Sequence, residues 1–147
     1  MARYLEILEK SFVIKIISAY SKNPRKEVVR KKKIYFWDTG VRNAIIEDLS
    51  SLDSRNDIGA LWENFCVIER LKTQEYKEII KQNYFWRSFS QKEVDWVEVR
   101  NQRLRALEFK FKKSSKNKMP KEFIKFYNPV SFEFIDRDNW LELVEMD

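Results

Sequence analysis

The feature that most constrains the fold is a long helical pattern followed at once by three strand-like segments. In residues 60–76, apolar side chains recur every three or four positions, as on a helix with one side in a core. Residues 84–89, 93–99 and 104–111 are rich in strand-forming side chains and are separated by short polar turns. Short turns join antiparallel neighbours, so the sequence predicts a three-stranded meander that carries a core helix.

The segments on either side extend this unit. Pro120 stands where a further helix would begin, and residues 130–135 are expected to form a strand parallel to the last strand of the meander. The elements expected upstream are a helix at 4–10, a strand at 12–17, a second strand within 27–37, and a short helix at 41–46 capped by Asp38 or Thr39. Together they predict an α/β fold with a central mixed sheet flanked by helices.

Several kinds of chemistry are excluded by residues that the chain lacks. Histidine is absent, which excludes Ser-His-Asp and Cys-His hydrolysis and histidine-based zinc sites. The single cysteine, Cys66, cannot form an internal disulfide, and its apolar neighbours predict a small buried side chain. Gly40 and Gly59 are the only glycines, so no glycine-rich loop can wrap a nucleotide phosphate.

The charge balance favours polyanionic partners, DNA first among them. The formal net charge is +6, and the basic residues are clustered. The predicted phosphate contacts are Arg30, Lys31, Lys32, Lys33, Lys112 and Lys113. A solvated, lysine-rich surface is the competing interpretation.

No apolar run is long enough to cross a bilayer and the first residues do not resemble a secretion signal, so a cytoplasmic protein without membrane contact is expected.

Glu63 lies on a side of the predicted core helix that otherwise looks buried. Its neighbours three and four positions away are Ala60, Cys66 and Val67. An unpaired carboxylate in such surroundings costs on the order of several kcal/mol, so a role for Glu63 is expected. A glutamate at the domain edge, or one paired with a lysine, is the competing interpretation.

Asp95 is a second carboxylate in an unusual place, the middle of a predicted strand. Alternation puts Asp95 on one face with Glu93 and Val97. Val94 and Trp96 then point to the other face. Aspartate is a poor strand former, so a bound cation or a buried hydrogen bond is expected at this position. An edge strand with alternating polar residues would also explain the pattern.

The next strand places Glu108 and Lys110 side by side, opposite Leu107 and Phe109, which are expected to face a core. Alone, such a pair is usually a surface ion pair worth less than about 1 kcal/mol. Together with the two carboxylates above, it supplies three oxygen ligands and one cation, a set suited to Mg²⁺ or Mn²⁺. The predicted catalytic set is Glu63, Asp95, Glu108 and Lys110, with the three carboxylates as metal ligands.

Five motifs together resemble one family. They are Asp38-Thr39-Gly40-Val41-Arg42-Asn43, Gly59-Ala60-Leu61-Trp62-Glu63-Asn64-Phe65, Tyr84-Phe85-Trp86-Arg87, Glu93-Val94-Asp95-Trp96 and Leu107-Glu108-Phe109-Lys110. Over residues 4–135 the chain resembles the C-terminal domain of prokaryotic, especially archaeal, AAA-type ATPases, whose last part is similar to the PD-(D/E)XK restriction-endonuclease fold. The resemblance implies a restriction-endonuclease-like core at 38–147. At 1–37 it implies a partial winged-helix appendage, a helix plus a β-hairpin.

In that superfamily, a helix glutamate, a strand aspartate and the E-x-K of the next strand bind metal and cleave phosphodiesters. The four predicted residues occupy these positions, so the resemblance implies a metal-dependent nuclease acting on DNA. Two departures stand out. The chain has no Walker motif, so we expect no ATP hydrolysis and a fragment or a stand-alone relative. The turn before the aspartate strand is Ser90-Gln91-Lys92, where the family usually has a glycine.

Two alternatives to catalysis remain open at this point. One is a catalytically inactive module of the same fold that binds DNA, forms a homo-oligomer or docks on an AAA-type ATPase. The other is a buried ion-pair network of the carboxylates with Lys110. A network of that kind predicts that divalent metal does not raise the melting temperature.

Overall fold

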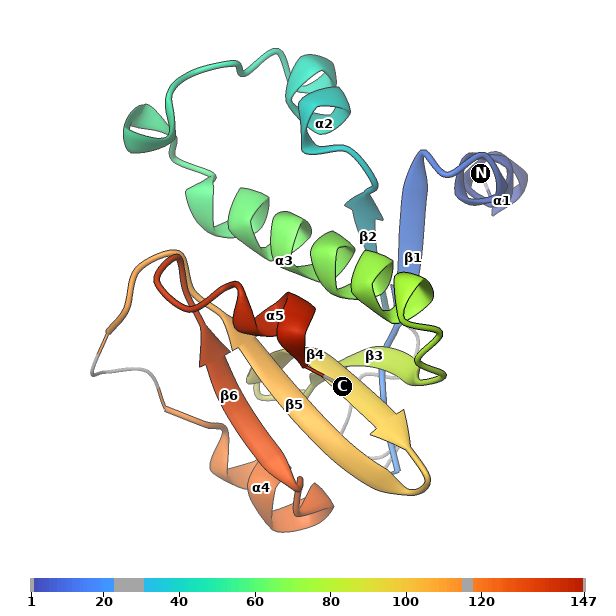
Figure 1. Cartoon of the computed structure of the whole chain (residues 1–147), viewed down its shortest axis with the longest axis vertical. Coiled ribbons are helices and arrows are strands. Elements are labelled where there is room, and N and C mark those ends of the chain that lie inside the picture. The colour runs from blue at the N-terminus through green and yellow to red at the C-terminus, as the bar shows by residue number, and fades with distance from the viewer. Residues whose placement is uncertain (1, 23–30, 115–117, 147) are drawn as a thin grey trace.

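The central sheet consists of four strands, β3 (Gln82–Arg87), β4 (Glu93–Arg100), β5 (Arg103–Phe109) and β6 (Ser131–Ile135), in the order β3-β4-β5-β6 (Figure 1). The computed structural model describes residues 2–22, 31–114 and 118–146. Strands β3, β4 and β5 are successively antiparallel, whereas β5 and β6 are parallel. The predicted meander and the predicted parallel strand are thereby confirmed.

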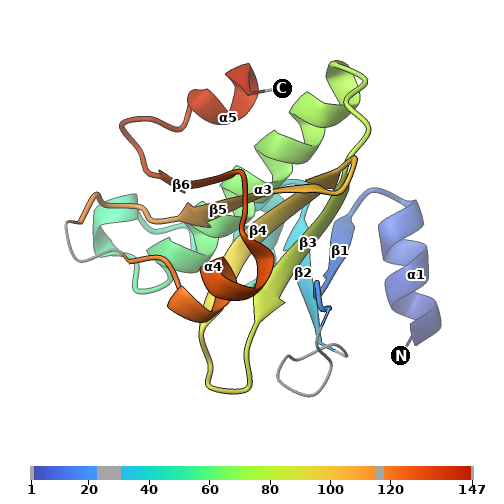
Figure 2. The same ribbon diagram turned by 90° about the horizontal axis from the view of Figure 1, so that it is seen from below.

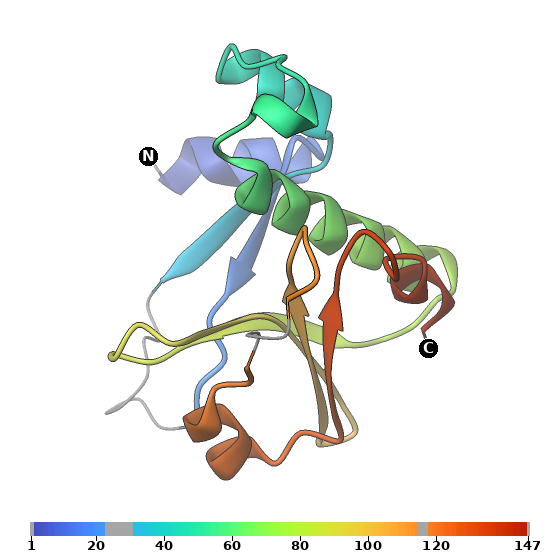
Figure 3. The same ribbon diagram turned by 90° about the vertical axis from the view of Figure 1, so that its left-hand side faces the viewer.

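Helices cover both faces of this sheet (Figures 2 and 3). Helix α3 (Ile58–Tyr76), the predicted core helix, lies across one face, and α4 (Lys121–Tyr127) packs on the other. Because α4 lies between β5 and β6 in the chain, it provides the crossover that parallel neighbours require. The short helix α5 (Glu142–Glu145) contacts α3 and was not predicted. None of the described helices is long and apolar enough to cross a bilayer.

The apolar core is divided between the two faces. Residues of α3, including Trp62 and Val67, pack against Trp96, Leu107 and Phe109 of the sheet. On the other face, the buried residues are Trp86, Val94, Val97, Leu104, Ala106 and, from α4, Phe123. Leu107 and Phe109 are thus buried as predicted, and Cys66 is a fully buried free cysteine, also as predicted.

Two turns of the meander contain residues in the left-handed backbone region. Asn101 and Gln102 join β4 to β5 with φ values of 49° and 64°, the sign that a tight two-residue hairpin requires at both positions. Gln91, in the turn before β4, has a φ of 65°. Glycine adopts this conformation without steric cost, whereas other L-residues pay about 1–2 kcal/mol. The turn that departs from the family pattern therefore keeps a geometry that favours glycine.

The N-terminal part forms a helix and a two-stranded sheet. Helix α1 (Ala2–Lys10) precedes β1 (Ile14–Ser18), which pairs antiparallel with β2 (Lys32–Phe36). Helix α2 (Thr39–Ile45) follows, and the Asp38 carboxylate caps it by accepting the Gly40 N–H at 2.6 Å. A single 3₁₀ turn (Leu52–Ser54) lies between α2 and the next helix along the chain, α3.

The structure differs from the sequence prediction at Phe12, and it does not describe Arg30. Phe12 was expected to begin the first strand, but it is an exposed turn residue with a φ of 54°, and β1 begins at Ile14. A strand residue cannot adopt that φ. Arg30, a predicted phosphate contact, lies outside the described residues, as does most of the window in which we expected the second strand to begin.

The β1–β2 hairpin shares the core with the central sheet. Ile17 and Tyr35 belong to the same buried cluster as Trp62 of α3, and the Tyr20 N–H donates to the carbonyl oxygen of Phe85 in β3 at 2.7 Å. The hairpin therefore continues the layer at the β3 edge and does not stand apart. The division into an appendage at 1–37 and a nuclease-like domain at 38–147 stays a prediction.

Asn64 of α3 attaches this hairpin to the helix. Its side-chain amide donates to the Phe36 carbonyl oxygen at 2.7 Å, and its Oδ1 accepts the Phe36 N–H at 2.8 Å. Asn64→Ala is expected to lower the free energy of unfolding by about 2 kcal/mol, because two backbone groups of β2 lose their partners. Urea unfolding of Lys72→Ala, on the exposed side of α3, is the control. Equal losses in the two variants would contradict the prediction.

A buried ion pair connects α3 to the sheet at the other end of the helix. Arg70 Nε and Nη2 donate to the two Glu98 oxygens at 2.5 and 3.0 Å, and both side chains are almost fully buried. Gln74, Lys81 and the Trp96 indole N–H also donate to Glu98. Burial opposes ionisation of Glu98, but these donors outweigh it and lower its pKa to about 2. This pair was not predicted from the sequence.

Candidate metal centre

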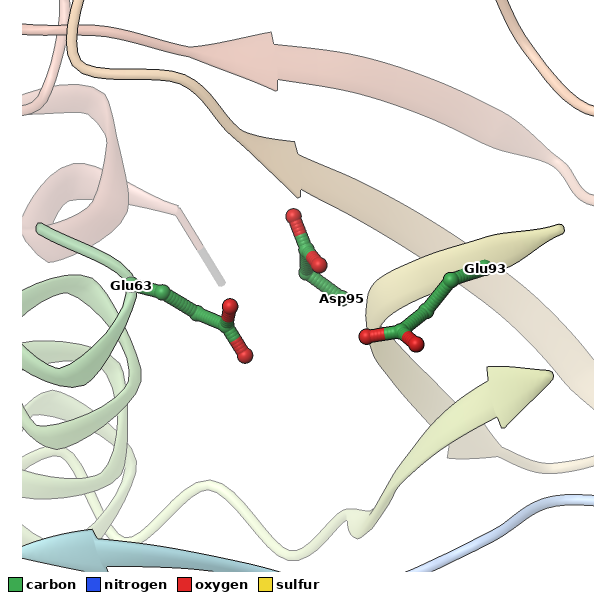
Figure 4. Close-up of side chains that lie close together, drawn as sticks. All are labelled: Glu63, Glu93 and Asp95. Carbon is green, nitrogen blue, oxygen red and sulfur yellow. The ribbon is translucent and has the colours of Figure 1, made fainter. Parts of the chain in front are cut away.

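Three carboxylates from two elements meet near the first turns of α3. Glu63 belongs to α3, whereas Glu93 and Asp95 belong to the beginning of β4, and their oxygens lie within 4.8 Å of one another. Figure 4 shows the three side chains pointing toward a common space. The structure thus brings together Glu63 and Asp95, two of the predicted ligands. It adds Glu93, which alternation had placed beside Asp95 without assigning it a role.

A β-bulge determines the direction of Asp95. The pairing register of β3 with β4 shifts by one residue after Val94, so β4 carries an extra residue there. As a result Val94 and Val97 contribute to the same buried cluster, on the α4 side, and Trp96 faces α3. Strict alternation had placed Asp95 on a face with Val97, and this is wrong because the bulge turns Asp95 to the α3 side.

Asp95 also contacts β5, where the two other predicted residues lie. The regular β4–β5 ladder begins only after Asp95, and its Oδ2 instead accepts the Phe109 N–H at 2.9 Å. Lys110 Nζ lies 3.8 Å from the same oxygen and 2.6 Å from Glu108 Oε1. Asp95 therefore lies beside Glu63 of α3 and near Lys110, which in turn pairs with Glu108.

Lys33 of β2 places an ammonium group among the carboxylates. Its Nζ lies 2.7 Å from Glu63 Oε1 and 3.6 Å from Asp95 Oδ1, and it also pairs with Glu93. Tyr35, the next residue on the same face of β2, donates its hydroxyl to Glu63 Oε1 at 2.7 Å. We had predicted Lys33 to be a surface phosphate contact, but only 19% of its side chain is exposed and it belongs to the acidic cluster.

The surroundings of Asp95 make its ionisation unfavourable. Burial, followed by the charges of Glu63 and Glu108, raises the pKa of Asp95 to about 7. Lys33 and Lys110 act in the opposite direction and only partly compensate. Burial would lower the pKa of Lys33, but the charges of Glu63 and Asp95 outweigh it and raise that pKa. The four carboxylates Glu63, Glu93, Asp95 and Glu108 thus outnumber the described basic side chains that pair with them, Lys33, Arg87 and Lys110.

Glu108 has a carboxylate oxygen without a partner among the described residues. Its Oε1 binds Lys110, whereas its Oε2 is buried and accepts no hydrogen bond from any described group. Buried polar atoms are nearly always satisfied, so this oxygen is available to bind a cation or a water molecule. Hard divalent cations such as Mg²⁺ and Mn²⁺ bind carboxylate oxygens. Among the described residues, the carboxylates close enough to share one cation are Glu63, Glu93 and Asp95, whereas Glu108 lies outside that group and adjoins it through Lys110.

The remaining basic residues that we predicted to contact phosphates are at the surface. Lys31, Lys32, Lys112 and Lys113 are all exposed. Tyr35 was not predicted from the sequence, and neither were the carboxylate partners of Lys33, although the two residues occupy alternate positions of a strand and so share one face. The run of basic residues around Lys33 concealed this pattern, because such runs are usually solvated.

Comparison with known proteins places most of the chain in one family. The model of a domain of unknown function, DUF4143, matches residues 58–139, more than half of the chain. A second model, DUF8612, matches residues 1–53 and is also a domain of unknown function.

Two curated mycobacterial proteins are similar to the chain. They are the uncharacterized protein Rv2008c of Mycobacterium tuberculosis and the uncharacterized protein Mb2031c of Mycobacterium bovis, each 32% identical over 102 residues. The match covers 66% of this chain but 22% of each relative, so the chain spans about a fifth of their length. No solved structure matches. The chain therefore belongs to the DUF4143 family, whose domain is found in AAA-ATPase-associated proteins.

Proposed function

We propose that this chain is a divalent-metal-dependent nuclease domain that cleaves DNA phosphodiesters, with a core of the restriction-endonuclease-like type. The observation that supports it most is the convergence of Glu63, Asp95 and the Glu108/Lys110 pair from three separate elements. Three carboxylates and a lysine at one end of a sheet supply the ligands and the cation that hydrolysis of a phosphate diester needs. The cofactor would be Mg²⁺ or Mn²⁺.

The residues would divide the work as follows. Glu63, Asp95 and Glu108 would hold the cation, and Glu93 would complete the charge around it. The bound cation supplies Lewis acidity and lowers the pKa of a water molecule. Lys110, whose pKa is raised because Glu108 and Asp95 outweigh the effect of burial, stays protonated at neutral pH. Its ammonium would orient the attacking water or neutralise charge that develops on the phosphate.

Lys33 would leave its present contacts when the cation binds. Its Nζ now occupies the neighbourhood of Glu63 and Asp95, and an ammonium and a divalent ion repel each other at that separation. Moved outward along β2, Lys33 would lie where the phosphate backbone of a DNA substrate approaches. The exposed Lys112 and Lys113 follow the E-x-K strand and would contribute to the same attraction.

The proposal is tested by metal binding and by cleavage together. At 100 times the dissociation constant, Mg²⁺ or Mn²⁺ is expected to stabilise the protein by about 2.7 kcal/mol and so to raise its melting temperature. The same ions should support cleavage of plasmid or branched DNA, and excess EDTA should abolish it. Glu63→Gln should lose both responses, whereas Glu69→Gln, on the solvated side of α3, should keep them. Cleavage that survives EDTA, or two variants that behave alike, would refute the assignment.

An apolar groove next to the hairpin favours a second function, that of an inactive module that binds a partner. The groove has a volume of about 520 Å³ and is lined in part by Phe12, Trp37, Leu71, Ile79 and Ile80, of which Phe12 and Ile80 are strongly exposed. A homo-oligomer or an AAA-type ATPase would cover such a surface. In that case Lys33 would stay paired with the acidic cluster, and divalent metal would leave the melting temperature unchanged. Light scattering would show an assembly that Ile80→Glu disrupts.

A further inference from the structure

We propose that the tip of the β4–β5 hairpin forms a binding pocket for a phosphate-bearing ligand, separate from the acidic cluster. A cavity of about 630 Å³ lies there and has four cationic side chains in its lining, Lys81, Arg100, Arg103 and Arg105. The remaining lining residues are Glu98, Asn101 and Val130. The volume is within the range of pockets that hold small molecules.

Strand register places the arginines on one face of the hairpin. Arg100 lies opposite Arg103 in the β4–β5 register, and Glu98 lies opposite Arg105. The side chains of these four residues therefore point to the face of the sheet on which α3 packs. Like charges opposite each other on neighbouring strands destabilise the pairing. Two guanidinium groups in this arrangement are stabilised by an anion that both can contact.

The carboxylates near the pocket neutralise only part of this charge. Glu98 already accepts both donors of Arg70 and the ammonium of Lys81, and Arg105 lies 3.5 Å from Glu133. In the part of the chain that the structure describes, Arg100 and Arg103 form no ion pair. Their guanidinium groups can therefore bind both oxygens of one phosphate, a geometry in which arginine is preferred to lysine.

The cationic lining continues around the hairpin tip. A neighbouring cavity of about 540 Å³ shares Lys81, Arg100 and Asn101 with the first and adds Lys22. A ligand with more than one phosphate would contact both. Asp95 and Arg100 lie five positions apart on β4, which corresponds to about 17 Å along a strand. The pocket is thus distinct from the proposed metal centre and does not depend on it.

The experiment measures binding without metal, in EDTA and at low ionic strength, by calorimetry. The probes are inorganic pyrophosphate and a 5′-phosphorylated single-stranded oligonucleotide. The double variant Arg100→Gln/Arg103→Gln is expected to bind the preferred probe at least about tenfold more weakly than the parent. Lys121→Gln/Lys125→Gln removes the same charge from exposed positions of α4 and should bind as the parent does. Melting temperatures without ligand should show that both variants fold, because all four side chains are exposed.

The outcomes separate the two sources of phosphate. Tighter binding of pyrophosphate indicates a free phosphorylated molecule, and tighter binding of the oligonucleotide indicates a nucleic acid. Equal weakening in the two double variants, or no binding of either probe by the parent, would overturn the proposal. Asp95→Asn should bind both probes as the parent does. Failure of the nuclease assignment would therefore leave this result unaffected.

Discussion

Glu98→Ala is expected to lower the free energy of unfolding by about 3–5 kcal/mol, one of the largest stability effects available in this chain. The substitution leaves the Arg70 guanidinium buried without its bidentate partner, and it removes the acceptor for Gln74, Lys81 and Trp96. Arg70 also donates to the Leu143 and Met146 carbonyl oxygens, so the docking of α5 should weaken too. Urea unfolding followed by tryptophan fluorescence measures the loss.

A surface pair provides the control for this prediction. Lys92 Nζ lies 3.0 Å from Glu122 Oε1, but both side chains are more than two-fifths exposed, so Glu122→Ala should cost less than about 1 kcal/mol. The acid range gives a second check. The pKa of Glu98 is about 2 in the folded protein against an ordinary 4.5. Ionised Glu98 therefore contributes to the free energy of unfolding above pH 4.5, and this contribution is lost as the pH falls toward 2. A loss in Glu98→Ala no larger than that in Glu122→Ala would contradict the prediction.

Asp95→Asn is expected to reduce metal-dependent DNA cleavage at least about 100-fold while making the metal-free protein more stable at pH 8. The loss of activity follows from removal of a proposed metal ligand. Asparagine keeps the acceptor for the Phe109 N–H, so the local backbone should persist. Cleavage is measured with Mg²⁺ or Mn²⁺ on plasmid DNA, and stability by thermal unfolding in EDTA.

The gain in stability has a defined pH dependence. The pKa of Asp95 is about 7 in the folded protein, above its ordinary 3.8, so the folded state binds the proton more tightly than the unfolded state. The protonated Asp95 carboxyl therefore contributes to the free energy of unfolding of the wild-type protein below about pH 4. This contribution is lost as the pH rises to 7. The advantage of Asp95→Asn should be largest above pH 7 and should disappear near pH 4. A variant that cleaves normally, or is less stable at pH 8, would argue against the proposed role.

Local patterns predicted the elements well but not their exact pairing. The apolar spacing within α3, the short turns of the meander and the position of Pro120 each depend on neighbouring residues, and the structure confirms all three. The bulge at Asp95 depends on an offset between two strands, which the sequence of β4 alone does not contain. The direction of Asp95 could therefore not be predicted from alternation.

The partners of the charged side chains were also beyond what local sequence patterns could predict. Glu63 and Asp95 stood out because their immediate neighbours are apolar. Arg70 and Glu98 are 28 residues apart, and each looks like an ordinary surface residue until the helix crosses the sheet. Lys33 looked solvated for the same reason, since its partners Glu63 and Asp95 lie far along the chain. Pairing between distant charges is a property of tertiary structure, and no local pattern reports it.

The position of Lys33 links two regions of the chain energetically. It reaches the carboxylates from β2, within the first 53 residues, whereas the carboxylates themselves lie in the segment that the DUF4143 model matches. Any displacement of the hairpin that withdraws the ammonium raises the affinity of the three acids for another cation. Thermodynamic reciprocity requires that cation binding favours the displaced hairpin by the same free energy. Whatever holds or pulls the N-terminal segment in a longer protein would thereby adjust the charge state of the acidic centre.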